Sequence, residues 1–187
     1  MDSLRADVTL VPLDLQHAPQ MVEWMADPTV RDGIGLRRDA TLASTEEWIH
    51  RAQQDSTLQA FAILFSGKHV GNVILDRRDD YLKSVRLSIY LGETSARGAG
   101  VGSAALNLAL QHAFTELNLH KVWLTVHAEN HSAIASYLRA GFVLEGIHRD
   151  EFLIGERRLS AHYMGILRHE FEGPASSTKL AKAEPQP

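Results

Sequence analysis

The chain contains 187 residues, of which 44% are hydrophobic and 22% charged, and its formal net charge at pH 7 is −4. This length and apolar content suit one globular domain and exclude wholesale disorder. The absence of cysteine excludes disulfides, thiolate metal sites and a cysteine nucleophile. The acidic balance argues against a nucleic-acid partner that is held by bulk charge.

Neither a membrane span nor an export signal is visible in the sequence. The apolar run of residues 61–65 is too short to cross a bilayer. Residues 1–5 lack the apolar core of a secretory signal. We therefore expect a cytoplasmic protein with no membrane partner.

The first third of the chain predicts one strand and two helices. Residues 8–12 alternate as a strand does, and Pro12 suits a strand end or a sheet edge. Residues 16–25 carry apolar side chains at helical spacing. Residues 31–40 form a charged segment with two glycines, which predicts a loop. After it, Ser44 and Glu47 match a capping box that begins a second helix.

Three strand-like runs follow, and then helices and strands alternate. The gap between the first two runs has the size of a hairpin turn, so an antiparallel meander is expected. The predicted strands are residues 59–65, 69–76, 85–91, 122–126, 142–147, 151–154 and 159–167, and the predicted helices are residues 101–117 and 132–140. This order predicts an α+β fold, in which helices cover the faces of a mixed sheet.

The C-terminal end differs in composition from the rest of the chain. Residues 173–187 are small and polar, with no apolar period, which predicts a disordered tail. We expect residues 1–172 to form a single domain.

A glycine-rich segment lies between the meander and the long helix. Gly98, Gly100 and Gly102 alternate with small residues where a strand ends and a helix begins. Glycines permit positive φ angles and a close approach to backbone N–H groups, and a helix N-terminus adds free donors and partial positive charge. The segment predicts a pyrophosphate site; a flexible turn with a helix cap is the alternative.

Two common phosphate-binding motifs do not fit this segment. It contains no Gly-Lys-Ser/Thr, so it is not a nucleoside-triphosphate P-loop. Because residue 103 is serine, the glycine spacing does not match the G-x-G-x-x-G dinucleotide motif.

A second motif lies about thirty residues downstream. A strand ends near Val126, and Asn130 or Ser132 caps a helix. Gly141 ends that helix, and Phe142 begins the next strand.

Together the two motifs resemble those of the GNAT superfamily of N-acetyltransferases. Residues 97–102, Arg-Gly-Ala-Gly-Val-Gly, are similar to the family's Q/R-x-x-G-x-G/A acetyl-CoA motif. Asn130, Tyr137 and Gly141-Phe142 resemble its second motif, in the right order and separation. Residues 117–122 and Glu145-Gly146 resemble the RimJ/RimL and spermidine acetyltransferase branch, and the resemblance covers roughly residues 85–167.

The resemblance implies a fold and a binding mode for acetyl-CoA as co-substrate. The fold is a mainly antiparallel sheet of about seven strands with a splayed central pair and helices on both faces. The implied coenzyme-binding residues are Ile89, Tyr90, Leu91, Arg97, Gly98, Ala99, Gly100, Val101, Gly102 and Asn130. In the family, backbone amides of the glycine turn hold the pyrophosphate, while the pantetheine arm pairs with the end of the preceding strand, where a β-bulge splays two parallel strands. A backbone N–H there polarises the thioester carbonyl, and the asparagine contacts the pantetheine or the nearby phosphates.

The resemblance also implies a reaction, in which a primary amine attacks acetyl-CoA directly within a ternary complex. Tyr137 matches the tyrosine that protonates the leaving thiolate, a role that suits a phenol; simple packing beneath the sheet is the alternative. The expected acceptor is a small amine metabolite, an amino sugar or a protein N-terminus. In residues 31–39 arginines outnumber aspartates, which argues against a polyamine. A non-catalytic acyl-CoA-binding or regulatory module with the same fold is the alternative function.

Several roles stay open at this point. The general base is unassigned among Asp76, Glu93, Glu151 and a water chain. His127 and His131 lack the H-E-x-x-H order, so no metal is expected. A homodimer is possible for a member of this family.

Overall fold

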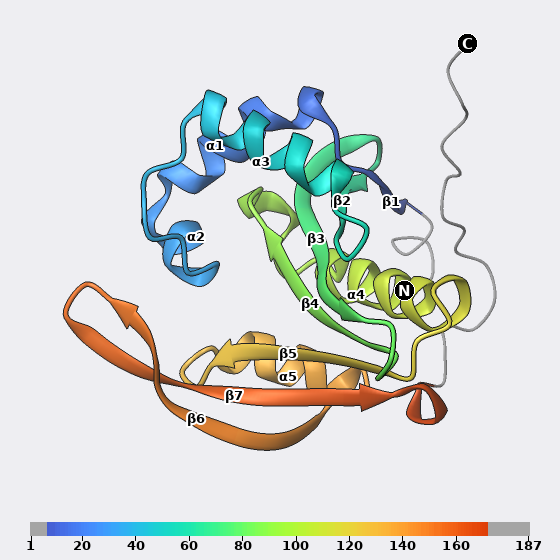
Figure 1. Cartoon of the computed structure of the whole chain (residues 1–187). Helices are drawn as coiled ribbons and strands as arrows, with labels where there is room; N and C mark the ends of the chain where they lie inside the picture. The colour runs from blue at the N-terminus through green and yellow to red at the C-terminus, as the bar shows by residue number, and fades with distance from the viewer. Residues whose placement is uncertain (1–6, 172–187) are drawn as a thin grey trace, which may run out of the picture.

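The computed structural model describes residues 7–171, so the predicted tail at residues 173–187 lies outside the described residues. Seven strands form one sheet in the order β1-β2-β3-β4-β5-β7-β6 (Figure 1). The strands are β1 (Val8–Pro12), β2 (Gln59–Phe65), β3 (Lys68–Asp79), β4 (Ser84–Leu91), β5 (Lys121–His127), β6 (Val143–Ile154) and β7 (Arg157–Leu167).

Five α-helices and four short helical segments connect the strands. The α-helices are α1 (Ala18–Ala26), α2 (Pro28–Gly33), α3 (Leu42–Gln54), α4 (Val101–Gln111) and α5 (His131–Arg139). The short segments are the 3-10 turns η1 (Leu15–His17), η2 (Thr94–Ala96) and η4 (Arg168–Glu170) and the π-helical segment η3 (His112–Glu116). Within residues 7–171, no helix has the length and apolar character that a membrane crossing needs.

The sheet is antiparallel except at its centre. Strands β1 to β4 form the predicted meander, and β7 pairs antiparallel with both β5 and β6. Only β4 and β5 run parallel. The expected α+β class, the seven strands and the mainly antiparallel pairing are therefore confirmed.

Apolar side chains on both faces of the sheet bury two separate clusters. Neighbouring residues of a strand point to opposite faces, so Ile63 joins the larger cluster and Ala62 the smaller one. The larger cluster holds the apolar side of α4, with Leu106 and Leu110. The smaller cluster packs α1 and α3 on the other face, which confirms helices on both faces (Figure 1).

The structure corrects three local predictions in the first half of the chain. Helix α3 begins one residue after Thr41, whose hydroxyl accepts from the backbone N–H of Ser44 over 3.1 Å, so the capping box is Thr41 and Ser44 rather than Ser44 and Glu47. The predicted loop at residues 31–40 begins inside α2, because Asp27 caps that short helix through the N–H of Thr29. The strand predicted at residues 69–76 is longer than expected and reaches Asp79.

Two further corrections concern the second half. The regular part of the long helix ends at Gln111 and continues as η3. The two strand segments predicted at residues 142–147 and 151–154 are one strand, β6, which pairs with β7 across two irregularities. This pairing is between distant segments, so the local sequence pattern does not reveal it.

Candidate active site

The two central strands separate soon after they meet. Strands β4 and β5 pair at three positions, Ser84 with Lys121, Val85 with Val122 and Arg86 with Trp123. Beyond Arg86 the described structure has no pairing between them, and the two ribbons diverge (Figure 1). The expected splay of the central pair is therefore present, and it leaves one side of β4 without a strand partner.

No β-bulge lies within residues 89–91, but the N–H groups of Gly92 and Glu93 both donate to the carbonyl of Val70, over 3.0 and 3.1 Å, which is the pattern of a bulge directly after β4. The register between β3 and β4 is regular from Gly71 opposite Leu91 to Asp76 opposite Arg86. The irregularity lies on β3, between Asp76 and Asp79, where Arg77 has a φ of +52°. This irregularity on β3 lies opposite the start of β4, where β4 is still paired with β5.

Backbone alternation determines which groups of β4 face the opening. The N–H of Gly92 donates to the carbonyl of Val70 over 3.0 Å, so Gly92 turns its backbone toward β3. Since alternate residues of a strand turn their N–H and C=O groups to opposite sides, Leu91 and Ile89 turn theirs toward β5. The backbone of Tyr90 faces β3. Of the three residues expected to pair with a pantetheine arm, two therefore turn their backbone groups toward the opening.

The glycine-rich turn has the geometry of an anion cradle. Gly98 and Gly100 have φ angles of +77° and +81°, a conformation that L-residues with side chains adopt only at a cost. A Cβ atom added at either position would meet no atom within 4 Å. The space beside the turn is therefore open.

Unpaired donors of α4 point into this space. Gly100 is the N-cap of α4 and provides no side-chain cap, and the first turn contains no acidic residue. The first bond of the helix runs from the N–H of Ala104 to the carbonyl of Gly100 over 3.0 Å. The preceding N–H groups of Val101, Gly102 and Ser103 thus have no helical acceptor, and together with the helix dipole they favour an anion.

Arg97 lies at the border of this turn and reaches back to β4. Its Nε and Nη2 atoms donate to the carbonyl oxygen of Leu91 over 3.3 and 3.0 Å. The guanidinium is exposed, which places a fixed positive charge between the turn and the open end of β4.

Tyr137 lies on α5 and packs against the larger cluster. Its ring is half-buried and contacts Phe142, with 5.7 Å between ring centroids. Burial alone raises the pKa of Tyr137 to about 12. The phenol is therefore protonated throughout the physiological range and can act only as a proton donor.

Asn130 is the N-cap of α5, as one of the two predicted alternatives has it. Its Oδ1 atom accepts from the N–H of Ala133 over 3.2 Å and from the hydroxyl of Ser132 over 3.1 Å. The cap uses the oxygen of the amide and leaves the Nδ2 donor for another partner.

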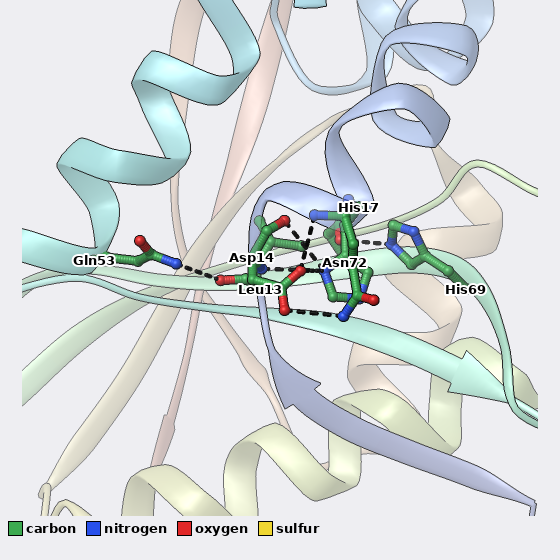
Figure 2. Close-up of polar contacts among 7 residues, drawn as sticks. Leu13, Asp14, His17, Gln53, His69 and Asn72 are labelled. Atoms are coloured by element: carbon green, nitrogen blue, oxygen red, sulfur yellow. Dashed lines mark hydrogen bonds and ion pairs between the residues drawn. The ribbon is translucent and has the colours of Figure 1, made fainter. Parts of the chain in front are cut away.

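The opposite face of β3 and β4 carries a buried polar network that the sequence analysis missed. Asn72 is fully buried, and its Oδ1 atom lies 3.0 Å from Nε2 of His69 (Figure 2). Its Nδ2 atom donates to the hydroxyl of Tyr90 over 2.6 Å. Burial raises the pKa of Tyr90 to about 12, while the hydrogen bond from Asn72 acts in the opposite direction. The only signal in the sequence was one polar residue in an apolar strand.

Aromatic rings connect this network to the first helices. His17 contacts His69 edge to face, with 4.8 Å between ring centroids, and is held by Asp14 (Figure 2). Trp24 of α1 also lies against His69, at 4.7 Å. A Cβ at Gly92 would fall 1.9 Å from the ring of Trp24, so only glycine allows α1 to come this close to the end of β4.

His127, the last residue of β5, was considered in the sequence only as a metal ligand. Its Nε2 atom is buried and has no hydrogen-bond partner in the described structure. The ring stands 4.0 Å from that of Phe152 on β6. Burial lowers the pKa of His127, while the charges of Asp32 and Glu129 act in the opposite direction. In residues 7–171 no three acidic or histidine side chains gather as metal ligands would.

The three carboxylates considered as general bases are engaged elsewhere or exposed. Asp76 holds Arg86 in a two-pronged ion pair, with Nε at 2.7 Å and Nη2 at 2.5 Å. Glu93 accepts from Lys68 over 2.9 Å. Glu151 is exposed, 3.8 Å from His148.

Comparisons with known proteins agree with this geometry. A family described as "Acetyltransferase (GNAT) domain" matches residues 7–143. The spermidine N(1)-acetyltransferase of Escherichia coli (strain K12) is 31% identical over 117 residues, or 63% of this chain and 62% of that protein. The match thus spans less than two thirds of that relative. A putative ribosomal N-acetyltransferase of Bacillus subtilis, YdaF, is 26% identical over 88% of this chain and 87% of that protein.

A solved structure extends the similarity over the whole fold. The spermidine N-acetyltransferase of Vibrio cholerae, in complex with CoA and spermine, superposes with a TM-score of 0.83 at 25% identity. The superposition covers 88% of this chain and 97% of that one. That structure contains CoA, and the open turn and the splayed strands of this chain suit the same coenzyme.

Proposed function

Because the chain belongs to the GNAT acetyltransferase family, we propose that it transfers an acetyl group from acetyl-CoA to a primary amine. The observation that carries the proposal is the open turn at residues 98–102. Two glycines with positive φ leave space beside it, and the first N–H groups of α4 have no helical acceptor. A diphosphate supplies the negative charge and the acceptor oxygens that this arrangement lacks.

Residues of β4 and α5 are suited to bind the remainder of acetyl-CoA, which supplies a thioester whose carbonyl carbon is open to attack by an amine. The backbone groups of Ile89 and Leu91 that face the opening would hold the pantetheine arm as a further strand holds its neighbour, once Arg97 releases the carbonyl of Leu91. One N–H of this strand would polarise the thioester carbonyl. The Nδ2 donor of Asn130 would contact the arm or the nearby phosphates.

Tyr137 is the proposed general acid. It lies on α5, the helix that follows β5, and it packs on the same face of the sheet as α4. Its neutral phenol can give a proton to the sulfur as the carbon–sulfur bond breaks. The alternative is that Tyr137 serves only to pack the helix. That role explains the contact with Phe142, but it does not require a hydroxyl group at this half-buried position.

The opening supports direct attack within a ternary complex. Helices α4 and α5 lie on one face of the sheet, whereas α1 and α2 lie toward the other (Figure 1). With the coenzyme on the face of α4, the acceptor can reach the thioester from the face of α1 and α2. Donor and acceptor would then meet between β4 and β5, and no acetylated side chain is needed.

Two observations bear on the acceptor. The curated relative and the solved structure are both spermidine acetyltransferases by name, and the solved structure contains spermine, which makes polyamines the first acceptors to test. In the chain itself, Arg31 lies 3.7 Å from Asp32 and 3.5 Å from Asp39, so α2 and the segment after it pair their aspartates with an arginine and offer no cluster of free carboxylates. Small monoamines, amino sugars and peptide N-termini therefore belong in the same panel.

The experiment is thiol release from acetyl-CoA across this amine panel, with Tyr137→Phe as the matched control. We expect release with at least one primary amine and a large loss in the variant. A non-catalytic acyl-CoA-binding module, the second candidate, predicts coenzyme binding by calorimetry with no release for any amine. An absence of coenzyme binding would contradict both functions.

Self-association through the edge strand β6 is part of the proposal. This strand lies at the end of the described sheet and exposes Val143, Leu144, Ile147 and Leu153. An exposed apolar edge strand is a template for pairing with a second chain. Light scattering should give a mass above that of one chain, and Ile147→Lys should reduce it to the monomer mass.

A further inference from the structure

We infer that His127 is the general base that takes the proton from the acceptor amine. The inference rests on the proposed function and assigns the role that the three carboxylates leave open. It is carried by the position of His127 at the splayed end of β5, by the face to which its ring points and by the absence of a hydrogen-bond partner at Nε2.

The face follows from the alternation of β5. Val122, Leu124 and Val126 belong to the larger cluster beneath α4. His127 follows Val126, so its side chain points to the opposite face, where α2 lies. Tyr137 packs on the cluster face. The acid and the base therefore stand on opposite sides of the opening, as direct attack by an amine requires.

The surroundings of the imidazole suit a base. Phe152 of β6 covers one side, and burial lowers the pKa of the ring, which favours its neutral form. The charged groups that act on it are Asp32 from α2 and Glu129 from its own segment, both of which favour the imidazolium. Glu129 is itself paired with Arg157 over 2.9 Å. Asp32 lies 3.7 Å from Arg31, but of the two carboxylates it acts more strongly on the imidazole, so we assign to it the stabilisation of the positive charge formed during the reaction.

The proton balance closes with these two residues. His127 accepts one proton from the acceptor nitrogen while that nitrogen forms its bond to the acetyl carbon. The carbon–sulfur bond breaks, its electron pair stays on sulfur, and Tyr137 gives its phenolic proton to that sulfur. Imidazolium and phenolate then return to their neutral forms by proton exchange with water.

The test combines kinetics with a direct titration. His127→Gln should lower kcat/KM for the best amine of the panel by about a hundredfold or more, with unchanged CoA affinity by calorimetry. His148→Gln, a change at an exposed histidine, should have no effect. In NMR titrations, the imidazole resonance that disappears in His127→Gln should titrate below the ordinary histidine pKa.

The aspartate provides a second, matched pair of variants. Asp32→Asn removes a negative charge beside the imidazole, so the acidic limb of the pH–rate profile and the NMR titration should both move to lower pH. Asp39→Asn removes the other carboxylate near Arg31. The side chain of Asp39 is 93% exposed, so this variant should move neither the acidic limb nor the NMR titration. Wild-type kcat/KM in His127→Gln, or an acidic limb that Asp32→Asn does not move, overturns the inference. A wild-type protein that acetylates no amine instead overturns the proposed function, and the base with it.

Discussion

The guanidinium of Arg97 and the carbonyl oxygen of Leu91 form a two-pronged contact of 3.3 and 3.0 Å. The contact joins the glycine-rich turn to the end of β4, on the side that faces the opening. It occupies one backbone acceptor that a pantetheine arm would use, and it holds a cation next to the proposed diphosphate site. Because the guanidinium is exposed, it can exchange this carbonyl for a phosphate oxygen at low cost.

Gly100→Asp should weaken coenzyme binding by at least about a hundredfold, since it brings a negative charge to the phosphates and a Cβ into the open space. Calorimetry with CoA measures the effect. Gly155→Asp is the matched control, because Gly155 also has a positive φ of 59° and open space around its Cβ position. Both variants carry the same backbone strain, but only the first should lose affinity. Equal affinities would mean that the phosphates bind elsewhere.

Tyr137→Phe should lower kcat by about a hundredfold to ten-thousandfold, the usual contribution of a positioned acid. The KM for the amine and the affinity for CoA should change little, because the ring and its contact with Phe142 remain. Steady-state kinetics together with calorimetry separate these effects. A variant with wild-type kcat would reduce Tyr137 to a packing residue.

The two buried tyrosines should make the protein sensitive to alkaline pH. Burial raises the pKa of Tyr90 and of Tyr137 from 10.0 to about 12. Between these values the unfolded chain loses protons that the folded chain retains, so stability is unaffected below pH 10 and falls as the pH rises toward 12. Urea unfolding at pH 8 and pH 11 tests this. Tyr137→Phe should lose less stability over that interval than the wild type, and an equal loss would contradict the assignment.

Asn72→Ala should lower the free energy of unfolding by about 2–4 kcal/mol, because it leaves two buried partners, His69 and Tyr90, without their hydrogen bonds. Tyr90→Phe removes only one of these bonds and should cost less. Urea unfolding of both variants and of the double variant gives the coupling. Additive effects would show that the network does not act as a unit.

Most of the fold was predictable because its signals are local. The strand-like runs of residues 59–65 and 85–91 placed two strands almost to the residue. The start of α3 was not predictable, because Thr41 and Ser44 are both good N-cap residues and the choice between them depends on the extended backbone of Thr41. The continuity of β6 depends on its pairing with β7, which no local pattern contains.

The candidate site divides in the same way. The glycine turn and Tyr137 are visible in the sequence because a diphosphate cradle and a helix with its caps have fixed spacings. The roles of His127 and Asn72 cannot be seen in the sequence, because they come from contacts across the fold. His127 is placed by α2 and β6, and Asn72 by β4. A polar residue in a strand reveals nothing of its partners until the sheet is assembled.

The most direct measurement is a crystal structure of the protein with bound acetyl-CoA. The account predicts the diphosphate within hydrogen-bond distance of the backbone N–H groups of residues 98–102, and the pantetheine arm beside Ile89 and Leu91. A diphosphate bound away from this turn, or an arm that does not pass between β4 and β5, would contradict it.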